Sequence, residues 1–165
     1  MLISIFFAEF DIHGLTYTMG TAENGAKVWR NRDYKFSNLP DYLVGLLLFK
    51  LPHKFAPNPI RVVKITVPYP STLYIAHEAG SRSGGFETSL ADFGWTLEAD
   101  NAAIFTFQYV WKMVVTADNH PIVITLPQQT TDKTVFSIFA SGNVFKTTLY
   151  YETAMEYFFI KYCQH

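Results

Sequence analysis

The feature that most constrains the fold is a run in which large apolar side chains recur at every second residue. Between residues 104 and 115 these are Phe105, Phe107, Tyr109, Trp111 and Met113. Side chains at a period of two share one face of a β-strand, whereas a helix would spread them around its axis. The run therefore predicts one unusually long strand or a bent pair of strands.

Shorter segments with strand patterns accompany this run, and turn-forming residues separate them. They span residues 15–19, 26–30, 34–37, 44–51, 60–67, 71–77, 122–126 and 135–140. Aromatic residues, which pack well on pleated surfaces, make up 17% of the chain. Turn signals about every ten residues are typical of sandwiches and barrels. We therefore expect an all-β fold, an antiparallel two-sheet β-sandwich of jelly-roll-like form with about eight to ten strands.

The chain divides by pattern into one domain and two extensions. Residues 26–142 hold the clearest strand and turn signals, and 165 residues suffice for a single core. Residues 1–25 are expected to be an N-terminal extension. Residues 143–165 are expected to be a C-terminal extension, a strand followed by a helix, because their apolar spacing changes from period two.

Composition argues against several classes of function. The net charge of −1 gives no field to concentrate nucleic acid. The single cysteine, Cys163, permits no intramolecular disulfide and no thiolate metal cluster. No apolar run is long enough for a membrane-spanning helix, and the apolar start lacks the basic region of a signal peptide. We expect no metal and no cofactor.

The stretch from Ser71 to Glu98 is where we expect a binding site. Residues 71–77 are apolar on both faces and predict a central strand, and the segment after them is rich in glycine, serine and arginine. Loops of about a dozen residues in compact domains are often functional. Sugar rings stack on aromatic faces and are oriented by charged and amide groups. The predicted ligand-binding residues in the loop 78–95 and its supporting strand are Tyr74, Glu78, Arg82, Phe86 and Trp95.

The tryptophans leave one alternative open. Trp29 and Trp111 lie within alternating segments, so we expect both in the core. Trp95 follows Gly94 in a turn, from which its indole can face either the ligand or the interior.

Short motifs in a fixed order resemble a known class of module. They are Trp29-Arg30-Asn31-Arg32-Asp33-Tyr34-Lys35-Phe36, Leu39-Pro40-Asp41-Tyr42-Leu43-Val44-Gly45, Leu73-Tyr74-Ile75-Ala76-His77-Glu78 and Gly94-Trp95-Thr96. This order resembles non-catalytic β-sandwich accessory modules found beside sugar-active enzymes in secreted bacterial proteins. The resemblance covers about residues 27–140. Glu78 replaces a usual aspartate, and the insert of residues 80–85 is additional, so a shared ligand site does not follow.

The resemblance implies a non-enzymatic binding module outside the cell or at its surface. Carbohydrate, or another extracellular ligand, would be its partner.

Two other functions remain open from the residues alone. A structural or protein-interaction sandwich would assemble through strand edges or an aromatic face, as a homo-oligomer. A small glycoside hydrolase would need a pair of carboxyl groups about 5 to 10 Å apart. The candidates near the loop are Glu78, Glu87, Asp92 and Glu98, with His77 as the best single histidine.

Overall fold

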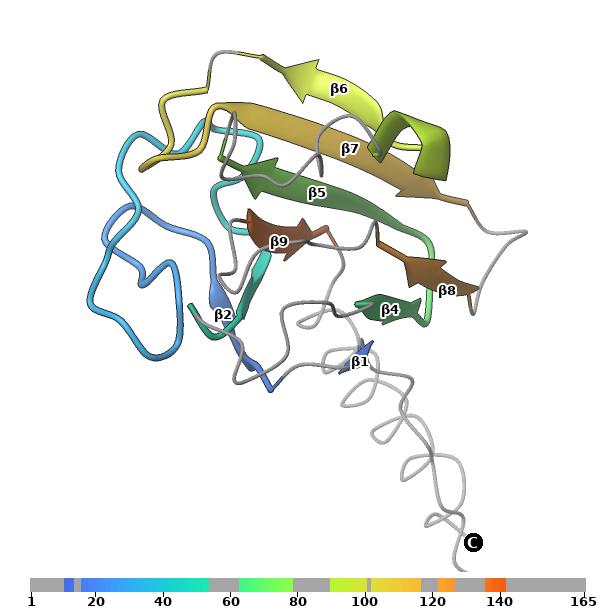
Figure 1. Cartoon of the computed structure of the whole chain (residues 1–165), viewed down its shortest axis with the longest axis horizontal. Helices are drawn as coiled ribbons and strands as arrows, with labels where there is room; N and C mark the ends of the chain where they lie inside the picture. The colour runs from blue at the N-terminus through green and yellow to red at the C-terminus, as the bar shows by residue number, and fades with distance from the viewer. Residues whose placement is uncertain are drawn as a thin grey trace, which may run out of the picture.

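The regular secondary structure of the residues that the structure describes is almost entirely β. The computed structural model describes residues 11–13, 16–53, 63–78, 90–100, 102–116, 122–126 and 136–141. The strands are β1 (Asp11–His13), β2 (Thr18–Thr21), β3 (Leu47–Lys50), β4 (Lys64–Val67), β5 (Ser71–His77), β6 (Thr96–Ala99), β7 (Tyr109–Val115), β8 (Ile122–Thr125) and β9 (Phe136–Ala140), with a short 3-10 helix, η2, at Ala91–Phe93 (Figure 1).

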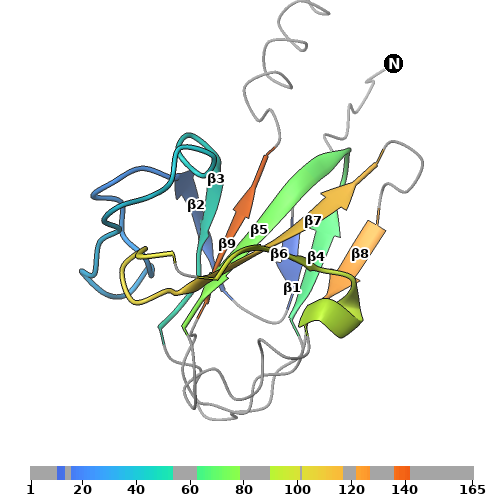
Figure 2. The same cartoon turned by 90° about the horizontal axis from the view of Figure 1, so that it is seen from above.

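The strands form two antiparallel sheets. The small sheet has the order β1-β4-β8, and the large sheet has the order β2-β3-β9-β5-β7-β6. Figure 2 shows the small sheet packed on one side of the large sheet. The predicted all-β, two-sheet sandwich is confirmed.

β5 is a central strand, as its sequence predicts. It pairs with β7 on one side and with β9 on the other. Leu73 and Ile75 face the core between the sheets, whereas Tyr74 and Ala76 face the opposite side. Both faces are apolar because both are covered.

The first core lies between the two sheets. Phe49, Phe136 and Ile138 of the large sheet meet Ile65 and Val67 of the small sheet, and all five side chains are at most 2% exposed. Full burial of one such side chain contributes about 1.5–3 kcal/mol. This apolar contact holds the sheets together.

A second core lies on the other face of the large sheet. An irregular segment, residues 22–46, and a turn at residues 102–107 cover this face; Figure 2 shows the irregular segment opposite the small sheet. The buried members of this core are Ala22, Val28, Trp29, Phe36, Leu39, Leu43, Leu48, Tyr74, Ala76, Ile104, Phe107, Val110 and Phe139. The molecule thus has a third, irregular layer, and the candidate sites lie in it.

The predictions for residues 26–30 and 34–37 were wrong in detail. The two segments approach each other, but only an isolated bridge between Lys27 and Lys35 links them. Their apolar side chains, including Val28 and Phe36, pack against the large sheet from outside. The alternation of apolar and polar residues in these two segments therefore indicates that one side is buried, and it does not show that the segments are strands of a sheet.

The long run at residues 104–115 is a turn followed by a single strand, so the prediction of one long strand or a bent pair of strands was wrong for its first half. Ile104 and Phe107 form an isolated bridge around Phe105 and Thr106, and β7 begins at Tyr109. Phe105, within this turn, adopts the left-handed backbone conformation, with φ +54°.

The predicted domain start at residue 26 is too late. β1 pairs with β4 in the small sheet, and β2 pairs with β3 in the large sheet. Ile12 and Ala22 are buried in the first and second core, respectively. Short strands with weak alternation are hard to recognise from sequence, because pairing with a partner strand defines them. The predicted C-terminal extension, residues 143–165, lies outside the described residues.

Candidate functional site

Trp95 belongs to the core between the sheets. Trp95 is 2% exposed, and its backbone N–H donates a hydrogen bond to the Leu90 carbonyl at 3.1 Å. Gly94 ends the 3-10 helix at φ +87°, which turns the chain so that the indole faces inward. Of the two orientations that the sequence left open, the structure has the buried one, so Trp95 presents no face to a sugar.

The other predicted site residues are separated. Tyr74 is 9% exposed and packs in the second core. Glu78 is partly buried, and its Oε1 accepts a hydrogen bond from the Thr106 hydroxyl at 2.7 Å. Arg82 and Phe86 lie outside the described residues, so a binding role for the loop 78–95 stays a prediction.

His77 is a structural residue of the large sheet. Its side chain is fully buried, Nδ1 lies 2.7 Å from the Glu78 carbonyl oxygen, and the Trp111 indole N–H donates to Nε2 at 2.9 Å. An indole nitrogen can only donate, so Nε2 must accept, and Nδ1 carries the proton that the carbonyl accepts. This pattern fixes a neutral imidazole in one tautomer. The prediction that Trp111 is a core residue holds in part, since it is partly buried against the first core.

The described residues hold no group of three or more histidine, cysteine, aspartate or glutamate side chains placed to bind a metal. The part of the chain that the structure describes also has no helix long and apolar enough to cross a membrane.

A hollow that sequence reasoning missed lies where the irregular layer meets the end of β6. We call it the Tyr42 hollow; its volume is about 460 Å³. Its lining residues are Asn38, Pro40, Tyr42, Glu98, Ala99, Asp100, Ala102, Ala103 and Ile104.

Local turns place the aromatic side of this hollow. Leu43 N–H bonds the Pro40 carbonyl at 2.9 Å, and Asn38 adopts φ +57°, which asparagine tolerates. Tyr42 is consequently 38% exposed, with its ring tilted against that of Tyr74 at a centroid distance of 5.6 Å.

Carboxylates line the opposite side. The end of β6 and the residues after it supply Glu98 and Asp100. Lys112 lies 3.6 Å from the Glu98 carboxylate. Burial, followed by the Glu98 carboxylate and Tyr74, raises the pKa of the Tyr42 hydroxyl above its ordinary value. The phenol is thus a neutral donor across the physiological pH range, beside an acidic wall.

The sequence did contain a signal for this hollow. The segment from Leu39 to Gly45 reads as a turn, and Tyr42 is its exposed aromatic residue. Its partners Glu98 and Asp100 lie more than fifty residues away along the chain, and only the fold brings them together.

Comparison with known proteins gives a fold but no family. No protein-family model matches the chain, and no curated protein matches it. Among solved structures, a β-glucuronidase from glycoside hydrolase family 2 aligns with a TM-score of 0.59 at 15% identity, over 81% of this chain. A GH138 enzyme targeting pectin rhamnogalacturonan II aligns with a TM-score of 0.53 at 16% identity, over 79% of this chain.

The chain spans only 14% of the first enzyme and 16% of the second. Its fold is thus like that of a small part of two much larger sugar-active enzymes. At this identity the likeness concerns the fold alone.

Proposed function

We propose that this chain is a non-catalytic, carbohydrate-binding β-sandwich module of a larger sugar-active protein that acts outside the cell. Its fold likeness to small segments of two large carbohydrate-active enzymes supports the module. The observation that carries the binding role is the Tyr42 hollow, which combines an exposed aromatic ring with hydrogen-bonding groups.

The chemistry of the Tyr42 hollow fits a neutral sugar. The Tyr42 ring offers an apolar surface for the C–H face of a pyranose ring. Glu98 and Asp100 accept hydrogen bonds from sugar hydroxyl groups, and the Asn38 amide both donates and accepts. Glu98 and Asp100 both line the hollow and Lys112 pairs with Glu98, so the carboxylates disfavour ligands with a negative charge.

The contacts of the carboxylates support binding over hydrolysis. A glycosidase needs one carboxyl group to protonate the leaving oxygen and another to act as nucleophile or base. Here Glu98 lies beside Lys112 and Glu78 accepts the Thr106 hydroxyl, while His77 has its ring nitrogens engaged. These side chains act as acceptors and structural groups.

A binding assay with matched variants tests the proposal. Neutral oligosaccharides are screened on a glycan array, and the best ligand is titrated by calorimetry. Tyr42→Ala should weaken binding about tenfold or more, whereas Tyr42→Phe keeps the ring and should retain most of the affinity. Val44→Ala is the control, because Val44 is an exposed residue of the same turn, outside the hollow.

Two results would contradict the assignment. Absence of any glycan ligand would remove the binding function. A ligand whose affinity falls in Arg82→Ala but not in Tyr42→Ala would move the site to the loop 78–95.

A further inference from the structure

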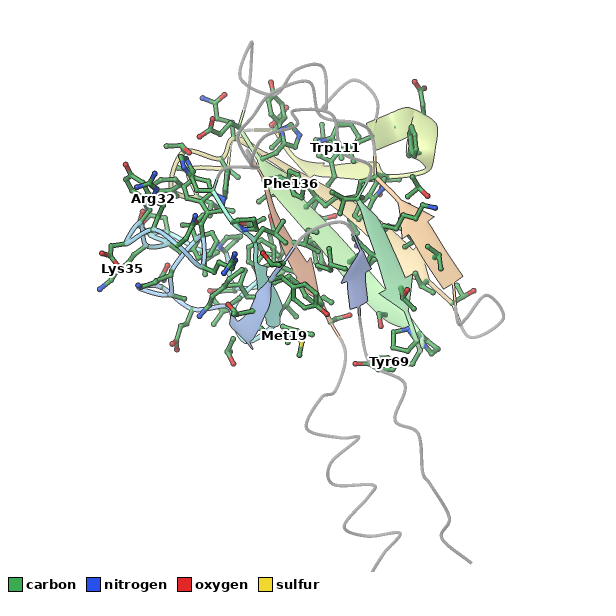
Figure 3. The ribbon with its side chains drawn as sticks, turned by 60° about the horizontal axis from the view of Figure 1, so that its bottom comes forward. Met19, Arg32, Lys35, Tyr69, Trp111 and Phe136 are labelled. Atoms are coloured by element: carbon green, nitrogen blue, oxygen red, sulfur yellow. The ribbon has the colours of Figure 1, made fainter. Side chains whose placement is uncertain are left out.

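A second hollow lies at the tip of the irregular layer, in the segment of residues 27–36. The Val28 N–H bonds the Tyr34 carbonyl at 2.8 Å, and the Phe36 N–H bonds the Ala26 carbonyl at 2.9 Å. The chain between them borders a shallow hollow, open to solvent, of about 370 Å³. We call this the Tyr34 hollow; it is lined by Asn31, Arg32, Asp33 and Tyr34. Figure 3 shows Arg32 and Lys35 on this tip, away from the two sheets.

Tyr34 is a supported aromatic platform. It is 51% exposed, yet its ring contacts those of Trp29 and Phe105 at centroid distances of 5.9 and 5.5 Å. His53 adds a third ring contact at 6.3 Å. A large side chain that already packs against other rings loses little conformational freedom when a ligand stacks on its exposed face.

Two costly features coincide behind this platform. Phe105 adopts φ +54°, and for a bulky residue this left-handed conformation costs about 1–2 kcal/mol. The Trp29 indole nitrogen is buried and has no hydrogen-bond partner in the described part of the chain. Strained backbone conformations cluster at functional sites. The rings of Phe105 and Trp29 are the ones that contact the Tyr34 ring.

The charge at the tip is positive, unlike that of the Tyr42 hollow. Residues 27–36 contain four basic side chains and one acidic side chain. The acidic one, Asp33, pairs with Lys27 at 2.7 Å; this lysine lowers the pKa of the Asp33 carboxyl, so it stays ionised and engaged.

Arg32 is the one basic residue among those that line the hollow. The Arg30 guanidinium donates to the Thr16 hydroxyl at 2.8 Å. Arg32 is exposed, lines the hollow, and makes no hydrogen bond or ion pair within the described residues. A planar guanidinium binds a carboxylate through two parallel hydrogen bonds.

We propose that Arg32 and Tyr34 form a second binding site, which takes an acidic sugar of the uronate class. The sugar ring stacks on Tyr34, and its carboxylate pairs with Arg32. One aromatic ring and one guanidinium that line the same hollow fit a ligand whose carboxylate is attached directly to a ring. The site is independent of the Tyr42 hollow, which prefers neutral sugars.

Two glycosides that differ only in the relevant group test this site. Methyl β-glucuronide and methyl β-glucoside are titrated into the isotope-labelled full chain and followed by NMR. The glucuronide should shift the signals of Arg32 and Tyr34 and bind at least about tenfold more tightly than the glucoside at this site. Arg32→Ala should abolish that preference, and Arg32→Lys should restore only part of it, because lysine lacks the paired donors.

Lys35→Ala and Tyr42→Ala are the controls. Lys35→Ala removes the same charge from the same tip without altering the hollow lining, so glucuronide affinity should change by less than about twofold. Tyr42→Ala should also leave it unchanged, which separates this site from the proposed neutral-sugar site. Equal binding of both glycosides, or equal losses in Arg32→Ala and Lys35→Ala, would overturn the proposal.

Discussion

Replacing Trp111 with phenylalanine should destabilise the fold through His77, although Trp111 is only partly buried. The indole N–H donates to His77 Nε2 at 2.9 Å, and His77 has no exposed surface. Phenylalanine keeps an aromatic ring on β7 but removes this donor. The Nε2 lone pair then lies in the first core without the hydrogen bond that Trp111 supplied.

The expected loss of folding stability follows from the burial of the His77 acceptor. A buried acceptor that loses its donor costs about 1–3 kcal/mol, more than the net value of an ordinary hydrogen bond. His77→Phe removes the acceptor instead and leaves the indole N–H of the partly buried Trp111 without this partner, so it also lowers the stability. His77 also stacks on Tyr109 at a centroid distance of 5.4 Å, a contact that phenylalanine preserves.

A double-mutant cycle measured by urea unfolding isolates the bond. In the His77→Phe background no acceptor remains, so Trp111→Phe should cost at least about 1 kcal/mol less than it does in the wild type. Nitrogen NMR should independently show the His77 proton on Nδ1. Additive effects of the two substitutions, or a proton on Nε2, would refute the reasoning.

Three further predictions concern the β1 strand, the Tyr42 hollow and the strained turn. Ile12→Ala should lower the free energy of unfolding by about 2–5 kcal/mol, while the exposed Val123→Ala stays within about 0.5 kcal/mol in the same denaturation assay. The pKa of the Tyr42 hydroxyl is raised above 10.0, so the stability that it contributes is present below pH 10.0 and is lost as the pH rises through the folded-state pKa. Glu98→Gln should lower this pKa only partly, because burial is the larger cause, and a carbon NMR titration measures the change. Phe105→Gly should be about 1 kcal/mol more stable than Phe105→Ala in thermal unfolding, because glycine relieves the positive φ that alanine retains; a reversed order would contradict the strain.

The central strands could be predicted because their burial is visible in the chain itself. β5 and β9 are apolar at successive positions, and such segments are stable only where both faces of a sheet are covered. The edges could not be predicted in the same way. β1 and β2 are three and four residues long, and their partners β4 and β3 define them as strands.

The candidate sites show the same division. The sequence indicated aromatic residues beside polar turns, but it could not orient them. Trp95 and Tyr42 both follow turn-forming residues, yet one indole is buried and the other ring is open to solvent. Whether an aromatic side chain is buried or exposed depends on whether distant parts of the chain cover it, and the local sequence does not contain that information.

The two-sheet β-architecture could be predicted from the residues alone, because apolar side chains at a period of two can be buried in few other ways. The irregular third layer over the large sheet, and its two hollows, one lined by two carboxylates and one on a basic segment, could be seen only in the fold. Tyr42 shares its hollow with Glu98, and the Phe105 ring contacts the Tyr34 ring. The members of each pair lie more than fifty residues apart along the chain, so no local pattern contains these arrangements.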